Sequence, residues 1–407
     1  MNKIPLHYQI LAAFVLALIL GIAIPSSAPY FSWLGDLFLR ALRMIIIPLI
    51  LTSIAAGAAN IGTGSDLGRI GGRTLVYYAA TTLTAILTGL ILVNIFRPGI
   101  GADLGLQESV THIKAADKSI GDILLEIVPT NIFQSFAAGD MLPIIFFALL
   151  LGFFAIQLEG KQKETVVNIF ASFFELMMKI TDFIIKFAPL GVFGIVVKII
   201  AEQSMRGTLI HTAGSLGTYM FVVAFGLAFH NFITLSGILY LGRINPLKHI
   251  KAMTVPMLTA FSTASSNATL PLTMEAVEKE EGVSNKISSF VLPLGATVNM
   301  NGTALYECVA VVFIAQAYGV ELTLTQQAIV VLTSLLSAVG TAGIPMASLA
   351  TISIILTAVG LPFEGMGLIL TVDRILDMMR TTVNVYGDTC GAAIIAKMEG
   401  EKLNTAR

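Results

Sequence analysis

The chain has 407 residues, of which 56% are hydrophobic and only 12% are charged. This composition excludes an ordinary soluble domain, in which about a quarter of the residues carry charge. The net charge of −1 excludes a general attraction to nucleic acid. Apolar runs of about 18 residues or more recur along the chain, and they predict an all-α polytopic membrane protein. The two cysteines lie in apolar segments and the five histidines show no ligand spacing, so we expect neither a disulfide framework nor a cofactor.

In the first half of the chain, apolar runs alternate with short polar connections. The run before Pro25 could pass for a signal peptide, but further spans follow at once, so we expect a retained first helix. The stretch from Arg97 to about Asp122 is polar and predicts an external loop. Helices are expected at about residues 6–24, 31–58, 74–96, 166–186 and 208–240, with two or three short helices within 123–158.

Basic residues indicate the orientation in the membrane, because loops on the cytoplasmic side carry an excess of lysine and arginine. With the N-terminus inside, the expected cytoplasmic loops carry Arg69, Arg73, Lys161, Lys163, Arg243, Lys248 and Lys251. The expected outer loops carry only Lys114, Lys118 and Arg206. We therefore predict that both termini are cytoplasmic. We also expect the protein to lie in a prokaryotic cytoplasmic (inner) membrane.

The second half of the chain contains two interrupted segments with the same plan. Residues 253–270 are too short and polar to span, and they predict a re-entrant hairpin before Pro271. The small-residue stretch SAVGTAGIP, which ends at Pro345, predicts a second hairpin. A span is expected from about residue 287 to residue 317, interrupted by NMNGT at residues 299–303. Pro271 lies 28 residues before Asn299, and Pro345 lies 28 residues before Asp373. Paired interrupted segments in two halves indicate a transporter's binding site at the membrane midplane; close helix packing by small residues is the alternative.

The stretch DRILDMMRTTVNVYGD, residues 373–388, is unusually polar for an apolar segment. As a helix, it places its polar side chains on one face about 100° wide. These side chains are Asp373, Asp377, Arg380, Thr381, Asn384 and Asp388. Ionisable groups within a membrane are expensive and favour a functional role. A cation beside carboxylates, an amide and a hydroxyl suits a small zwitterion with a second acid group, whereas a self-neutralising salt-bridge cluster is the structural alternative.

The motifs TLPLTMEAV, NMNGTALYE, GTAGIP and DRILDMMRTTVNVYGD resemble those of the dicarboxylate/amino acid:cation symporter family, and the similarity runs nearly end to end. The resemblance implies a homotrimer whose protomer has eight spans, two re-entrant hairpins and inverted repeats, and which works as an elevator. A scaffold would comprise residues 1–66 and 99–190. A mobile transport domain would comprise residues 67–98 and 191–400, with a cytoplasmic tail at 401–407.

The resemblance also implies roles for individual residues in binding an acidic amino acid. Arg380 would hold the side-chain carboxylate, which a planar guanidinium suits, and Asp377 would hold the amino group. The main carboxylate would be held by Thr381, Asn384, Ser265, Ser266, Gly343 and Thr303. Many relatives carry a second arginine at one of two positions that are Ala264 and Met378 here, and Arg374 is an alternative source of that charge.

Sodium sites follow from the same resemblance, since hard cations take carboxylate and carbonyl oxygens. The first would use Asp388, Asn299, Gly295 and Asn384, and the second Thr297, Ala338, Val339 and Thr341. The third would use Tyr78, Thr81, Thr82, Asn299 and residue 301. Here the chain carries Asn301 where the family usually has aspartate, which puts the third site in doubt. Glu307 matches a glutamate that resembles a proton carrier, and its alternative is a structurally paired glutamate.

The leading interpretation is a secondary-active symporter for L-glutamate or L-aspartate, coupled to Na⁺ with H⁺ as a further possibility, and not an enzyme. A proton-driven C4-dicarboxylate carrier is the alternative within the family, and Asp377 argues against it because a diacid has no amino group. An intramembrane aspartyl hydrolase is disfavoured, because Asp377 and Asp388 lie on one helix. No phosphate-binding loop of a primary pump is present in the sequence.

Overall fold

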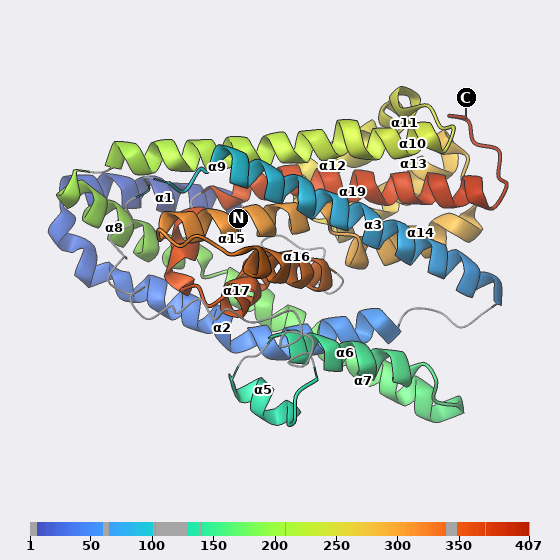
Figure 1. Ribbon diagram of the computed structural model, residues 1–407, viewed down its shortest axis with the longest axis horizontal. Coiled ribbons are helices and arrows are strands. Elements are labelled where there is room, and N and C mark those ends of the chain that lie inside the picture. Colours follow the sequence, from blue (N-terminus) through green and yellow to red (C-terminus); the bar gives the residue numbers. More distant parts are fainter. Residues whose placement is uncertain are drawn as a thin grey trace, which may run out of the picture.

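The computed structural model describes residues 6–59, 65–100, 102, 128–138, 141–207, 209–338, 348–370 and 372–406. Across these ranges the regular structure is helical, and the one β-bridge joins Ile244 to Ala406. The long helices run roughly along one axis and form an elongated bundle (Figure 1). The structure thus agrees with the all-α class predicted from the sequence.

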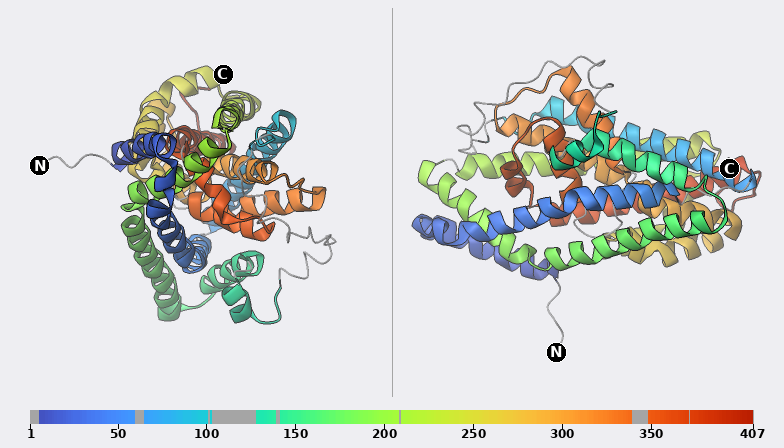
Figure 2. Two further views of the ribbon diagram at one scale, coloured as in Figure 1. Left: turned by 90° about the vertical axis from the view of Figure 1, so that its left-hand side faces the viewer. Right: turned by 90° about the horizontal axis from the view of Figure 1, so that it is seen from below.

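One group of helices is built around α2. It comprises α1 (Leu6–Ala23), η1 (Pro25–Ser27), α2 (Ala28–Ala59), α5 (Ile132–Ala138), α6 (Met141–Ala155), α7 (Gly160–Ile185) and α8 (Ala188–Arg206). Helix α8 packs on α1 and α2, and α2 also packs on α6 and α7. In the right-hand view of Figure 2, α2 and α7 lie side by side along one flank of the molecule.

A second group surrounds the C-terminal helix. It comprises α3 (Ser65–Phe96), α9 (Leu209–Phe229), η3 (His230–Leu235), α10 (Ser236–Leu241), α11 (Pro246–Ala252), α12 (Thr254–Thr263), α13 (Ser266–Ala276), η4 (Val277–Glu281), α14 (Asn285–Val298), α15 (Asn301–Ala317), α16 (Leu324–Ala338), α17 (Ser348–Ala358), η5 (Phe363–Gly365), α18 (Met366–Leu370) and α19 (Asp373–Met398). Helix α19 packs on α12, α14 and α15, and α15 packs on α3. Residues 301–315 and most of α19 are buried, so these two helices form the centre of this group.

The first hairpin has the form expected from the sequence. Helices α12 and α13 pack on each other and are joined at Ala264 and Ser265. Ala264 has a φ of 50°, in the left-handed region, where the Cβ atom of any L-residue is unfavourably close to the following carbonyl oxygen, so the backbone is strained at this turn. The Ser265 hydroxyl then accepts the amide N–H of Ala268 at 3.2 Å and begins α13 as an N-cap.

The second hairpin is described only in its two arms. Helices α16 and α17 pack on each other and on α15. The tip between them, which carries Val339, Thr341 and Gly343, lies outside the described residues.

Among the described residues, four helical segments are long and apolar enough to cross a membrane, or five if the bent pair α1 and α2 counts as one. These segments are Arg69–Phe96, Ala188–Met205, Ala213–Leu241 and Asn285–Ala317. The second was not predicted, because the expected helices end at about residue 186 and begin again only at about residue 208. In fact Pro189 occupies the first turn of α8, where its missing N–H costs nothing, so a new helix begins there.

Candidate functional site

The polar face of α19 lies inside the protein. Asp373, Asp377, Arg380, Asn384 and Asp388 are each 3% exposed or less, and Thr381 is also buried. Helix α15 begins directly against this face, since a Cβ added to Gly302 would lie 2.6 Å from the carbonyl oxygen of Arg380. Only glycine permits so close an approach of the two backbones.

Arg380 is held between two carboxylates of its own helix. Its Nη1 donates to Asp373 Oδ1 at 2.8 Å, and its Nε donates to Asp377 Oδ1 at 3.0 Å. Arg374 Nη1 lies 3.5 Å from the other oxygen of Asp377, so two arginines and two aspartates form a neutral cluster. Arg380 Nη2 lies 2.9 Å from Asp377 Oδ1 but makes no aligned hydrogen bond to any described residue, and Asp373 Oδ2 also lacks a partner among them. The cluster therefore retains one buried donor and one buried acceptor for a ligand.

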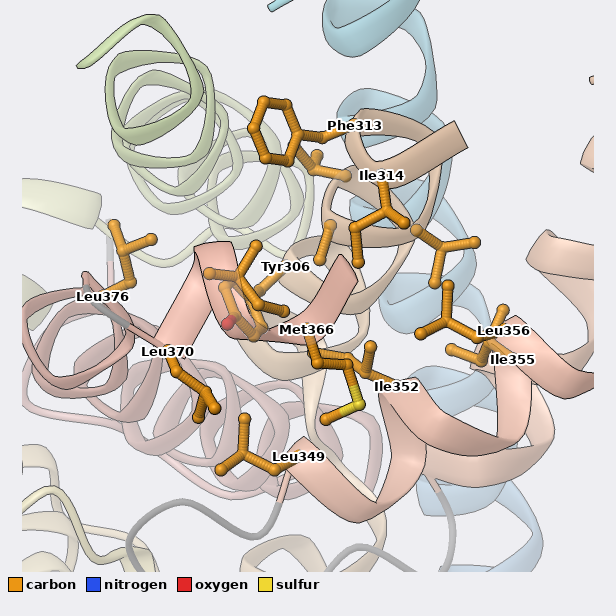
Figure 3. Close-up of a cluster of buried hydrophobic side chains, with 14 of the residues drawn as sticks. Tyr306, Phe313, Ile314, Leu349, Ile352, Ile355, Leu356, Met366, Leu370 and Leu376 are labelled. Carbon is orange, nitrogen blue, oxygen red and sulfur yellow. The ribbon is translucent and has the colours of Figure 1, made fainter. Parts of the chain in front are cut away.

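Tyr306 on α15 also contacts Arg380 and Asp373. Its ring centroid lies 4.2 Å from the guanidinium carbon, within the range of a cation–π contact. Its hydroxyl donates to Asp373 Oδ1 at 2.7 Å. Figure 3 shows this tyrosine among apolar side chains such as Leu370 and Leu376. This apolar surrounding strengthens the electrostatic contacts of the cluster, because the local dielectric constant is low.

Asn384 joins α19 to the first turn of α15. Its side-chain oxygen accepts the amide N–H groups of Gly302 at 2.8 Å and Thr303 at 3.3 Å. Its amide nitrogen donates to Thr303 Oγ1 at 3.0 Å. The break at Asn299 and Met300 leaves these N–H groups without helical partners, so Asn384 caps the second half of a broken helix.

Asp388 lies one turn further along, beside the end of α14. Its Oδ1 accepts from Asn299 Nδ2 at 2.8 Å, whereas Asn299 Oδ1 has no partner among the described residues. No described lysine, arginine or histidine forms an ion pair with this carboxylate. A Cβ on Gly295 would lie 2.5 Å from both Asp388 Oδ1 and the hydroxyl of Tyr78, so the α14 backbone is in direct contact with the site. A buried carboxylate without a cationic partner is a candidate position for a bound cation.

Asn301 contacts α3 next to this carboxylate. Its Oδ1 accepts the Thr82 hydroxyl at 2.7 Å, and its Nδ2 has no partner among the described residues. The hydroxyl of Thr81, by contrast, donates to the backbone of its own helix at Tyr77, 2.9 Å away. At this point the side chain of residue 301 therefore presents an amide N–H donor rather than a second acceptor oxygen.

Residues 6–398 match the model of the sodium:dicarboxylate symporter family. The chain belongs to this family.

Curated relatives agree with this assignment over nearly the whole chain. A proton/sodium-glutamate symport protein of Geobacillus stearothermophilus is 36% identical over 411 residues, covering 98% of this chain and 96% of the relative. The proton/glutamate-aspartate symporter of Escherichia coli is 34% identical and covers 98% and 93%, respectively. Neutral amino acid transporter A of Bos taurus is 37% identical and covers 90% and 76%. The family is one of transporters, and this chain is therefore a membrane symporter rather than an enzyme.

The symporter structure brings together most of the residues singled out from its sequence. Arg380, Asp377, Asn384 and Thr303 lie in one buried group. Asp388, Asn299, Gly295 and Tyr78 form the adjoining group. Of the remaining residues, Ser265, Ser266, Thr381 and Ala338 are buried, and Thr297 is half-buried with its hydroxyl donating to Leu294 O at 3.0 Å.

Two contacts of this symporter escaped the sequence analysis. Asp373 was placed on the polar face beside Arg380, where a salt-bridge cluster was one alternative, but its bond to Tyr306 was not foreseen. Glu307 is fully buried and accepts a short hydrogen bond from Thr351 on α17, while its Oε2 has no partner among the described residues. A buried polar residue on each partner helix was the only signal that could have suggested these pairs.

Proposed function

We propose that this symporter carries L-glutamate or L-aspartate together with Na⁺. The observation that carries the proposal is the buried guanidinium of Arg380, whose Nη2 makes no aligned hydrogen bond to the described residues. A planar guanidinium binds a carboxylate through two parallel N–H bonds, and burial makes such a bond stronger than in water. Bacterial relatives that are named as glutamate and glutamate-aspartate symporters support the same substrate class.

The partners of Arg380 suggest how the substrate would be bound. Asp377 contacts both Arg380 and Arg374, so its carboxylate is oriented before the substrate arrives. The side-chain carboxylate of the substrate would accept hydrogen bonds from the guanidinium of Arg380. The ammonium group of the substrate would donate hydrogen bonds to the carboxylate of Asp377. Thr381, Asn384, Thr303 and the hairpin serines Ser265 and Ser266 would contact the main carboxylate, with Gly343 from the second tip.

Sodium coupling is proposed on the basis of Asp388. Its ionised form has an amide but no cation beside it among the described residues, so its burial is unfavourable until a cation binds. Asn299 Oδ1 is a second free oxygen at the same place. The remaining oxygens would come from Gly295 and Asn384, and a second ion would use Thr297, Ala338, Val339 and Thr341.

We further propose that transport is an elevator movement within a homotrimer in a prokaryotic inner membrane, with both termini cytoplasmic. The group of helices around α19 would move against the group around α2. This division follows residues 1–66 and 99–190 against 67–98 and 191–400, except that α8 packs on α1 and α2 and would extend the scaffold to Arg206. Each protomer would then have eight membrane spans and two re-entrant hairpins.

A proton-driven mode is the second candidate, and Glu307 supports it. It is fully buried and its Oε2 has no partner among the described residues, so this oxygen is available to carry a proton. Relatives named as proton/glutamate symporters are consistent with this role. A plain C4-dicarboxylate carrier is less favoured, because it would leave Asp377 without an ammonium group to bind.

Uptake into proteoliposomes tests the proposal. Labelled L-aspartate and L-glutamate would be offered with a sodium gradient or a proton gradient imposed separately. Accumulation that requires the sodium gradient is expected. Accumulation under the proton gradient alone would assign coupling to Glu307, and no uptake of either amino acid would contradict the substrate proposed.

Replacing Asn301 by aspartate is expected to add a sodium-binding group next to Asp388. The new carboxylate would keep the oxygen that accepts from Thr82 and would exchange a free N–H donor for a second acceptor. The dependence of uptake on sodium concentration should become steeper, and its Hill coefficient should rise by up to about one, because one more ion would bind. An unchanged sodium dependence would show that residue 301 does not limit the number of ions; Thr84→Val is a matched control, because Thr84 donates only to its own helix.

A further inference from the structure

Helices α10 and α11 meet at the end of the bundle that carries the C-terminus (Figure 1). The apolar span Ala213–Leu241 ends at this corner. Its 29 residues, at about 1.5 Å per residue, match the thickness of a bilayer with its headgroups, which is about 40–45 Å. The corner therefore lies at the level of the lipid headgroups, and on the cytoplasmic side in the proposed orientation.

Three basic side chains just beyond this span are exposed. Arg243 lies in the connection between the two helices, and Lys248 and Lys251 lie on α11. The two lysines are three residues apart, so they are neighbours on the helix surface. Both ammonium groups are thus within reach of one bound anion.

Acidic side chains do not neutralise these three charges. Residues 203–274 contain no aspartate or glutamate. Among the described residues, none of the three basic side chains forms an ion pair. By contrast, Lys279 on η4 lies 2.7 Å from a carboxylate oxygen of Glu275. The corner between α10 and α11 therefore carries a local excess of positive charge.

Helix η4, which packs on α11, carries three glutamates. Glu281 Oε2 lies 2.9 Å from His249 Nδ1, inside the protein. Glu278 accepts from Asn285 Nδ2 at 2.9 Å. Glu280 is exposed and forms no ion pair with a described residue. The positive charges of α11 consequently remain available to an external partner.

Apolar side chains are exposed next to the basic ones. Leu241 and Leu247 are 82% and 79% exposed. Helical hydrogen bonds continue through Met253 into α12, so Leu247, Lys251 and Val255, spaced four residues apart, lie on one face. Basic and apolar side chains together on an exposed helix face are typical of a segment that lies in the membrane interface. A soluble anion would have no use for the apolar part of this surface.

We propose that the basic–apolar surface, formed by Leu241, Arg243, Leu247, Lys248 and Lys251, binds the headgroup of an anionic phospholipid. The basic side chains would contact the phosphate, and the leucines would contact the upper part of the acyl chains. A zwitterionic lipid suits the surface less well, because its own ammonium group would be repelled by the same cations. Since α12 follows α11 directly, the lipid would hold the base of the first hairpin at the membrane surface. The inference rests on the proposed orientation but not on the proposed substrate or coupling ion.

Fluorescence quenching by brominated lipids tests this site in the full-length protein without requiring transport. The chain has one tryptophan, Trp33. Trp33→Phe combined with Leu247→Trp therefore places a single reporter within the surface. The reporter protein would be reconstituted in phosphatidylcholine vesicles that contain equal amounts of dibrominated phosphatidylglycerol or dibrominated phosphatidylcholine. We expect phosphatidylglycerol to bind about 25-fold more tightly at low salt, because each lysine near a membrane surface contributes a factor of about five.

Further substitutions in the reporter protein identify the groups that bind the lipid. Lys251→Gln should lower the preference for phosphatidylglycerol about fivefold, and Lys248→Gln with Lys251→Gln should abolish it. Lys248→Arg with Lys251→Arg keeps the charge and should keep the preference. Lys279→Gln is the matched control and should leave the preference unchanged, because that lysine is already paired with Glu275.

Three results would overturn the proposal. The first is equal quenching by the two lipids in the reporter protein. The second is a preference that persists in the variant with both glutamines. The third is loss of the preference when soluble glycerophosphoglycerol is added, which would assign the site to a free anion rather than to a lipid.

Discussion

Replacing Arg380 by alanine is expected to lower the uptake of L-glutamate and L-aspartate by about 100-fold or more. Truncating one partner of a buried, hydrogen-bonded charge pair costs about 2–5 kcal/mol. Arg380 is the one arginine of the cluster that is 1% exposed and contacts both Asp373 and Asp377. The measurement is the apparent substrate affinity and the maximal rate of uptake into proteoliposomes under an inward sodium gradient.

Two variants separate recognition of the substrate from loss of the fold. Arg380→Lys keeps a positive charge between the aspartates but lacks the planar fork, so it should fold and still transport poorly. Arg374→Ala removes the neighbouring arginine, whose side chain is 21% exposed and lies 3.5 Å from Asp377, and should have a much smaller effect. Uptake that remains normal in Arg380→Ala would contradict the proposed role.

Replacing Asp388 by asparagine is expected to weaken sodium binding by roughly 100- to 1,000-fold. At an effective dielectric constant of about 20, a charge about 4 Å from a bound ion is worth about 4 kcal/mol. Asp388 is hydrogen-bonded only to the neutral amide of Asn299 among the described contacts, so the substitution removes the negative charge at this place. The substitution keeps the size of the side chain, so packing against Gly295 and Tyr78 is retained. The sodium concentration that supports half-maximal uptake at saturating substrate measures the effect.

An aspartate on the outside of the bundle provides the matched control for Asp388. Asp36 on α2 is exposed, and Asp36→Asn makes the same chemical change away from the site. Its sodium dependence should equal that of the wild type. A sodium dependence of Asp388→Asn that also equals the wild type would exclude this carboxylate as a ligand and favour coupling through Glu307.

The first hairpin and the broken helix at NMNGT are features that could be predicted from the sequence. The polar run at residues 262–269 and the break at NMNGT predicted a hairpin and a broken helix, and the structure has α12, α13, α14 and α15 at these places. Local chemistry explains this success, since a chain of polar and small residues cannot continue an apolar helix. The roles of Val339, Thr341 and Gly343 stay predictions, because these residues lie outside those described.

Contacts between side chains that lie far apart in the sequence could not be predicted from local sequence patterns. Tyr306 and Asp373 are 67 residues apart, and Glu307 and Thr351 are 44 apart. The His249–Glu281 pair spans 32 residues and reaches a threonine 140 residues from the histidine. The periodicity of one helix indicates which of its own faces is buried, but it does not identify the side chains of another helix that will contact that face.

By itself, the sequence determined the membrane class, the family, the broken helices and the polar face of α19, because hydropathy, helical period and local motifs are properties of neighbouring residues. Only the tertiary structure decided that Arg380 is held by Asp373, Asp377 and Tyr306 together, and that Asp388 is buried without a cationic partner among the described residues. The physical reason is that the energy of a buried charge depends on every group packed around it. Those groups come from helices whose relative positions are set by packing rather than by their own sequences.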